Sequence, residues 1–204
     1  MTQITSAEEL ENIMGTPLAA TRDKVRTSLH ELDRQWLAAS SLVLVATSDA
    51  EGNLDVSPKG DPAGFTKVLD DTRIAIPERP GNRRADGFHN ILGNPHVGLI
   101  YLIPGRGDTL RINGRARLLS DAAYFDDMIV RGHRPAFALE VAIDEVFYHC
   151  SKAFLRSKAW EPEGWEPNAV PRRAVIAQAI ERQGEELAVL DEYYGPSYGD
   201  KIYG

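Results

Sequence analysis

The segment from Leu110 to Leu118 alternates strictly between apolar and polar residues, and it limits the possible folds more than any other part of the chain. Leu110 and Ile112 alternate with Arg111 and Asn113, and the pattern continues to its end. A period of two puts the apolar side chains on one face of a β-strand and the polar ones on the other. The polar face carries three arginines, and we expect two of them, Arg115 and Arg117, to face solvent or another subunit.

Five other segments have the length and composition of short strands. The first is a continuous apolar, β-branched run, and the turn Asp49–Asn53 connects it to its expected hairpin partner. Helices are missing between the first three strands, which argues against a doubly wound α/β sheet and favours a small antiparallel barrel. The five segments are Ser41–Thr47, Leu54–Lys59, Arg73–Pro77, Val97–Ile103 and Ala136–Phe147.

Helical periodicity flanks these strands. Ser6 and Glu9 have the spacing of a capping box, which predicts a helix near the start of the sequence. We expect one domain over 1–204, with helices in 1–40 and a helix plus a tyrosine-rich tail in 161–204. Two further helices are predicted over Thr21–Ala39 and Asp86–Leu92. Another should follow Ser120, with Tyr124, Phe125, Met128 and Ile129 pointing inward. The last two should begin at Ser151 and include Val175 to Leu190, respectively.

The composition excludes several functional classes. A net charge of -7 argues against a general nucleic-acid binder. Cys150 is the single cysteine, which suits the cytoplasm, and the first residues lack a signal-peptide pattern. Since no apolar run reaches the roughly 18 residues of a membrane span, we expect a cytoplasmic protein without a membrane partner. The histidines are scattered, so we expect no metal site.

A basic loop follows the third predicted strand. Pro77–Arg84 contains three arginines, bending residues and the approach to a short helix. Arginine presents a planar fork of donors that matches phosphate oxygens, and a helix amino terminus adds free N–H groups. The loop therefore resembles a phosphate clamp. Composition equally allows a solvated loop that pairs with Asp70, Asp71 or Glu78.

Two further stretches are candidate ligand contacts. In Val56–Pro62, Gly60 permits close backbone approach, and Lys59 and Asp61 could hydrogen-bond the edge of a heterocycle. An ordinary strand-ending turn explains this stretch as well. Lys152, Arg156 and Trp160 recur at four-residue spacing, which predicts one helix face that meets a ligand, a partner's loop or solvent.

The order of these motifs resembles the pyridoxamine 5'-phosphate oxidase-like family of FMN-binding split barrels, and above all its branch of uncharacterised FMN-dependent proteins. The resemblance covers about Leu37–Trp160 and depends on the motifs occurring together in this order. They are Ser57-Pro-Lys-Gly-Asp61, Arg79-Pro-Gly-Asn-Arg-Arg84, Asn94-Pro-His-Val-Gly-Leu99 and Leu110-Arg-Ile-Asn-Gly-Arg-Ala116.

The resemblance implies a six-stranded antiparallel split β-barrel, mainly β with flanking helices, that binds FMN non-covalently at the interface of a homodimer. It assigns the FMN phosphate to Arg83 and Arg84, with Asn82 and Arg79 beside them. It assigns the isoalloxazine ring to the strand-end segment, and Thr109 and Arg111 to a later strand that reaches the cofactor. The full set of expected cofactor-binding residues is Ser57, Pro58, Lys59, Gly60, Asp61, Arg79, Asn82, Arg83, Arg84, Thr109, Arg111, Lys152 and Arg156.

The chain departs from the true pyridoxamine-phosphate oxidases at their substrate site. Ser57 and Pro62 stand where those enzymes carry Arg and Lys, and their carboxy-terminal Trp and Arg pattern is missing. We therefore expect an FMN-dependent oxidoreductase that acts on another small molecule, without an assigned catalytic residue. The alternatives are a flavin-binding or flavin-sensing module without turnover, and a split barrel that uses F420 or haem.

Overall fold

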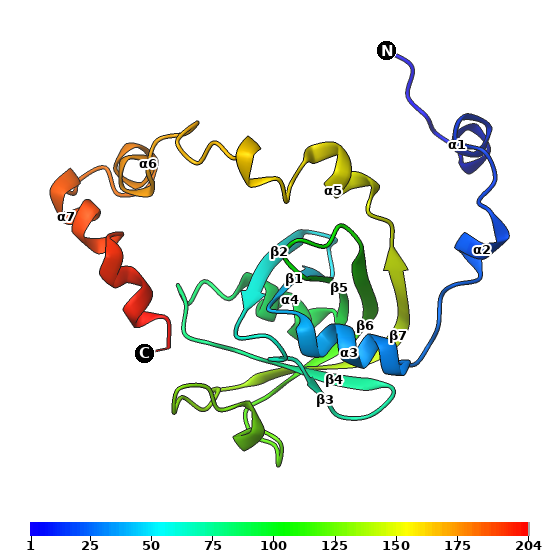
Figure 1. Ribbon diagram of the computed structural model, residues 1–204, viewed down its shortest axis with the longest axis horizontal. Helices are drawn as coiled ribbons and strands as arrows, with labels where there is room; N and C mark the ends of the chain where they lie inside the picture. Colours follow the sequence, from blue (N-terminus) through cyan, green and yellow to red (C-terminus); the bar gives the residue numbers. More distant parts are fainter. Residues whose placement is uncertain (204) are drawn as a thin grey trace.

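The computed structural model describes residues 1–203 and contains one antiparallel sheet of seven strands (Figure 1). The strand order is β2-β1-β5-β6-β7-β4-β3. Within the described part of the chain, the edge strands β2 and β3 do not pair with each other, so the barrel is open between them. The strands are β1 (Leu42–Ser48), β2 (Leu54–Gly60), β3 (Lys67–Val68), β4 (Arg73–Pro77), β5 (His96–Leu102), β6 (Thr109–Leu119) and β7 (Ala138–His149).

The predicted split-barrel fold is confirmed, but the predicted number of six strands is wrong. The additional strand, β3, has two residues, and it pairs with Ala75 and Ile74 of β4. A strand of this length is too short to show a period of two, so only its pairing reveals it.

Strand β6 has the predicted alternation. Leu110 and Ile112 are fully buried, whereas Arg115 and Arg117 are exposed. A bulge lies between Asn113 and Gly114, where β7 approaches closely. A Cβ atom on Gly114 would lie 2.1 Å from the carbonyl oxygen of Ala142, so this register requires a glycine.

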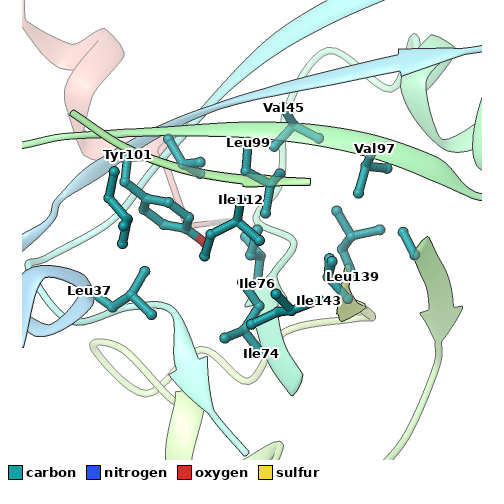
Figure 2. Packing of buried hydrophobic residues seen from close by; sticks show 14 of the residues in the cluster. Leu37, Val45, Ile74, Ile76, Val97, Leu99, Tyr101, Ile112, Leu139 and Ile143 are labelled. Carbon is teal, nitrogen blue, oxygen red and sulfur yellow. The ribbon is translucent and has the colours of Figure 1, made fainter. Parts of the chain in front are cut away.

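The core lies inside the curved sheet (Figure 2). Ile74 and Ile76 of β4 meet Leu99 and Tyr101 of β5, with Ile112 between them. Helix α3 (Glu31–Ala39) contributes Trp36 and Leu37, which close the core on one side. The buried Tyr101 hydroxyl lies 3.2 Å from the Thr66 hydroxyl, so the polar end of this ring has a hydrogen-bond partner.

The predicted helix over Thr21–Ala39 is wrong in its middle. The chain forms α2 (Ala19–Arg22), then an extended segment, then α3, which His30 caps. Arg26 makes an isolated β-bridge with Val146, and its guanidinium Nη2 donates to the buried Asp33 carboxylate at 2.9 Å. These contacts join distant parts of the chain and override the local helical period.

The other helices follow the predictions in part. Ser6 caps α1 as predicted. The segment after Ser120 forms only the short 3-10 helix η1, in which Met128 is buried, whereas Ile129 is exposed against expectation. The late helix is two helices, α6 and α7, with a small core of their own. These elements are α1 (Ala7–Met14), α4 (Asp86–Gly93), η1 (Asp126–Met128), α5 (Lys152–Ser157), η2 (Pro162–Gly164), α6 (Arg173–Ile180), α7 (Leu187–Tyr193) and η3 (Pro196–Lys201).

Helices α1 and α2 lie on an arm that extends away from the sheet (Figure 1). Neither helix buries a residue, and α1 leaves Leu10, Ile13 and Met14 exposed. Over residues 1–203, every helix is too short or too polar to cross a membrane.

Candidate cofactor-binding site

A cavity of about 930 Å³ lies beside β2, between the loop after β4, the start of α4 and the end of the chain. Most of the predicted cofactor-binding residues of the first two stretches line this cavity. They are Ser57, Pro58, Lys59, Gly60, Arg79, Asn82, Arg83 and Arg84. Asp61 touches a wall residue, Arg79, and lies at the edge of the site.

The loop before α4 has an unusual backbone. Arg83 and Ala85 both adopt the left-handed conformation, each with φ of 61°, and the Asn82 side chain accepts a hydrogen bond from the Arg84 N–H at 3.0 Å. No side chain caps α4, and the N–H groups of Phe88 and His89 already donate to the Ala85 carbonyl oxygen, so the N–H groups of Asp86 and Gly87 are the ones that an anion could use. The loop thus ends beside two helix N–H groups and the Asp86 carboxylate.

The two arginines of this loop differ in their partners. Arg84 pairs with Asp86, whose hydrogen bond raises the pKa of the guanidinium, and its side chain is 78% exposed. Arg83 has no hydrogen bond or ion pair with any residue that the structure describes. Arg83 can therefore bind an anion without losing another contact, whereas an anion at Arg84 would compete with the Asp86 carboxylate that already accepts from its Nε.

Arg79 is held by other parts of the protein. Its Nε donates to Asp61 at 2.6 Å, and the other two guanidinium nitrogens donate to the carbonyl oxygens of His133 and Met128. The Arg79 and Asp61 side chains are only 11% and 1% exposed. Arg79 thus forms a wall of the cavity, and a phosphate could bind it only in competition with these acceptors.

The three acids suggested as partners of the loop arginines pair with other residues. Asp70 pairs with Arg73, Asp71 with Arg34, and Glu78 with Lys59. The three acids suggested as partners are therefore wrong, but two of the loop arginines do pair with other acids, Arg79 with Asp61 and the exposed Arg84 with Asp86.

Strand β2 forms the opposite wall. Alternation along the strand leaves Asp55, Ser57 and Lys59 half-buried, and all three line the cavity. Ser57 donates to Asp55 at 2.6 Å, and the Lys59 ammonium lies 4.4 Å from the centroid of the Phe88 ring. Lys59 also pairs with Glu78 at 2.5 Å. This wall therefore presents both charged and polar groups to a ligand.

Several residues of the cavity were not predicted. Phe88 and Phe137 pack edge to face with centroids 4.8 Å apart. Gly87 faces Asp55, and a Cβ atom there would lie 3.1 Å from the carboxylate oxygen. The other unpredicted lining residues include Thr47, Asp55, His133 and Tyr203. Alternation with Ser57 could have identified Asp55, but no local signal connects His133 or Tyr203 with this site.

Four predicted site residues lie outside this cavity. Thr109 is buried in β6 opposite His149, and the Arg111 guanidinium lies 5.0 Å from the ring centroid of Phe147. Lys152 and Arg156 are exposed on α5. A single chain does not bring these four residues to the cavity that Arg83 lines.

The predicted helix face of Lys152, Arg156 and Trp160 is also wrong in part. Helix α5 ends at Ser157, and Trp160 lies beyond it. The Trp160 ring stacks on Phe154 at 5.6 Å and 7°, and its Nε1 donates to the carbonyl oxygen of Arg106 at 2.7 Å. The indole is thus held by its own chain.

The cavity combines an anion-binding end with aromatic and polar walls. Such a site suits a planar aromatic ligand that carries a phosphate group. Within residues 1–203, no group of three His, Cys, Asp or Glu side chains is arranged to hold a metal ion.

The comparisons with known proteins give the family. The family model for pyridoxamine 5'-phosphate oxidase matches residues 29–150, more than half of the chain. No curated protein matches the sequence.

Three solved structures have a similar arrangement. A protein from Lactobacillus delbrueckii described as a pyridoxamine 5'-phosphate oxidase is 27% identical, with 60% of this chain and 95% of that chain covered and a TM-score of 0.47. HupZ from Group A Streptococcus is 20% identical, with 59% of this chain and 94% of that chain covered and a TM-score of 0.47. A FAD-binding protein from Mesorhizobium loti is 18% identical, with 61% of this chain and 96% of that chain covered and a TM-score of 0.40. The family assignment rests on the family model. The chain belongs to the pyridoxamine 5'-phosphate oxidase family.

Proposed function

We propose that this protein binds FMN in the cavity beside β2 and uses it as an oxidoreductase that acts on a small molecule. The observation that carries this proposal is Arg83, which has no hydrogen bond or ion pair with the described residues, beside the uncapped start of α4 in a cavity of about 930 Å³ that also has aromatic walls. Ligand sites of this kind commonly have volumes of about 300–1,000 Å³.

The phosphate end of FMN fits the loop before α4. Arg83 and the first N–H groups of α4 supply donors, and Gly87 lets the chain approach Asp55 and Thr47 closely. Asn82 helps to set the backbone of the loop through its hydrogen bond to the Arg84 N–H. These residues would hold and orient the phosphate.

The ring end of FMN fits the wall of β2. Because β2 is an edge strand, half of its backbone donors and acceptors have no strand partner. Lys59 adds a side-chain donor, the Ser57 hydroxyl oxygen adds an acceptor, and Phe88 adds an apolar surface. When bound, the flavin itself would supply hydride chemistry, so the protein would need to provide only binding, orientation and electrostatics.

A homodimer would complete this site. Arg111, Lys152 and Arg156 lie outside the cavity of their own chain, so a second copy would have to bring them to the cofactor, whereas Thr109 is buried within its own chain. The exposed apolar residues of α1 support association, because an apolar helix stripe is normally buried against another element. We propose that the partner subunit covers the open side of the FMN site.

Pyridoxamine 5'-phosphate is not the substrate in this proposal. A phosphorylated substrate needs a second cationic pocket beside the one for the FMN phosphate. At the two positions where the true oxidases carry Arg and Lys, this chain has uncharged residues. Ser57 lines the cavity, and Pro62 is not among the lining residues. The substrate is therefore a small molecule without a phosphate of this kind.

Titration with FMN tests the proposal. We expect quenching of flavin fluorescence, a rise in Tm and a Kd in the micromolar range or below. Reduction of the bound flavin by NADH or NADPH, followed by stopped-flow reoxidation, would support an oxidoreductase. Bound FMN that no reductant of this kind reduces would favour a flavin-sensing module, and no binding at all would contradict the proposal.

A further inference from the structure

The last residues of the chain line the proposed cofactor cavity, although in sequence they lie well after the part that the family model matches. The tail runs from α7 back toward the barrel in Figure 1, and Ile202 and Tyr203 line the same cavity as Arg83. The matched region ends at residue 150. The tail is therefore a feature of this chain in addition to the family domain.

Tyr203 is held there by contacts with three other segments. Its hydroxyl donates to Asp61, whose second carboxylate oxygen accepts the hydrogen bond from Arg79. Its ring stacks on His133, with centroids 5.8 Å apart and an interplanar angle of 24°. The guanidinium groups of Arg79 and Arg131 lie 5.8 Å and 5.5 Å from the ring centroid. A hydrogen bond, a stacked ring and two cations thus hold one side chain.

The buried carboxylate of Asp61 is the central group of this arrangement. One oxygen binds the Arg79 guanidinium, and the other binds Tyr203, so both lobes of the carboxylate are used. The hydrogen bond to this carboxylate raises the pKa of the Tyr203 hydroxyl, because loss of its proton would place two anions together. The hydroxyl therefore stays protonated and able to donate at neutral pH.

The tail forms a wall and does not fill the site. A cavity of about 930 Å³ remains with Tyr203 in position, and the tyrosine is one of its lining residues. Aromatic rings at the edge of a cavity favour a planar ligand and keep water away from it.

We propose that Tyr203 is a wall of the cofactor site that covers the bound flavin and slows its release. This inference rests on the proposed binding of FMN. It adds a residue that lies outside the family-matched region, and it assigns a role to the tyrosine-rich tail.

The main test compares Tyr203→Ala, which removes ring and hydroxyl, with Tyr203→Phe, which removes only the hydroxyl. The matched control is Tyr198→Ala, because Tyr198 belongs to the same tail, is 51% exposed and contacts only Tyr193 and Tyr194 among the aromatic rings. The measurements are the rate of FMN dissociation and the quenching of bound-flavin fluorescence by iodide.

Loss of one aromatic contact between Tyr203 and the bound flavin would correspond to a change of roughly three- to tenfold. We therefore expect FMN to leave Tyr203→Ala roughly three to ten times faster than the wild-type protein, with greater quenching by iodide. The dissociation rate and the quenching of Tyr203→Phe should lie between those of the wild-type protein and Tyr203→Ala. Those of Tyr198→Ala should match the wild type. Unchanged dissociation and quenching in Tyr203→Ala would overturn the inference, as would an equal effect of Tyr198→Ala.

A second measurement needs no flavin. If Asp61 holds the tail, Asp61→Asn should make the last residues more accessible to carboxypeptidase than in the wild-type protein. Equal digestion of the two proteins would overturn the inference even if FMN binds. Slow digestion of the wild type together with no FMN binding would instead contradict the proposed function and leave the held tail in place.

Discussion

Replacement of the two loop arginines separates their contributions to phosphate binding. Arg83 has no ion pair or hydrogen bond to give up within the described residues, so its whole interaction with phosphate adds to affinity. Arg84 already pairs with Asp86, and this competing contact reduces what it can add. Arg83→Ala also leaves the strain of the left-handed backbone unchanged, because both side chains carry a Cβ atom.

The expected size follows from these contacts. A charge-assisted hydrogen bond typically changes affinity by roughly ten- to a hundredfold, and exposure to solvent moves the value toward the lower end. We expect Arg83→Ala to weaken FMN binding by roughly tenfold and Arg84→Ala by roughly two- to threefold. Asp86→Asn should tighten binding by roughly twofold, because it frees Arg84 and removes a negative charge beside the phosphate.

Calorimetric titration of each variant with FMN and with riboflavin tests this ranking. Riboflavin lacks the phosphate, so its affinity should change little in any of these variants. Arg115→Ala is the control, because Arg115 is an exposed arginine on β6 that does not line the cavity. Equal losses for FMN and riboflavin would refute the phosphate assignment, and a larger loss in Arg84→Ala than in Arg83→Ala would refute the argument from Asp86.

Three further predictions concern stability, assembly and substrate. Burial alone would raise the pKa of Asp33, but hydrogen bonds from Arg26 and the His30 N–H lower it below its usual value. The ionised Asp33 carboxylate therefore stabilises the fold fully above the unfolded pKa of about 3.9, and this stabilisation is lost as pH falls through the folded pKa. Asp33→Asn should lower the free energy of unfolding by roughly 2–4 kcal/mol at pH 7 and flatten its acid dependence in urea melts, and an unchanged pH profile would contradict this assignment. Light scattering of the FMN complex should give the mass of two chains, and the mass of one chain at micromolar concentration would exclude the proposed shared site. Purified protein should not convert pyridoxamine 5'-phosphate to pyridoxal 5'-phosphate, and steady turnover that stops when FMN is removed would show that other basic residues bind the substrate.

The strands with a clear local pattern could be predicted from the sequence. The alternation of β6 and the apolar run of β1 reflect which face each residue buries, and neighbours along the chain carry this information. The loop Arg79–Arg84 was also identifiable by composition, and it lines the cavity together with Ser57–Gly60. These parts of the fold and of the site depend on residues that are neighbours in the sequence.

Contacts between distant residues decided the rest. Arg26 leaves a helical pattern because it reaches Asp33 and Val146, and Arg79 lines a wall because Asp61 and two carbonyl groups use its donors. Tyr203 joins the site from the other end of the chain. A buried charge needs partners wherever the fold can supply them, and a single sequence does not reveal which distant segment will do so. The sequence by itself therefore determined six of the seven strands and the basic loop, whereas only the tertiary structure revealed β3 and decided which of the loop's charges remain free to bind a ligand.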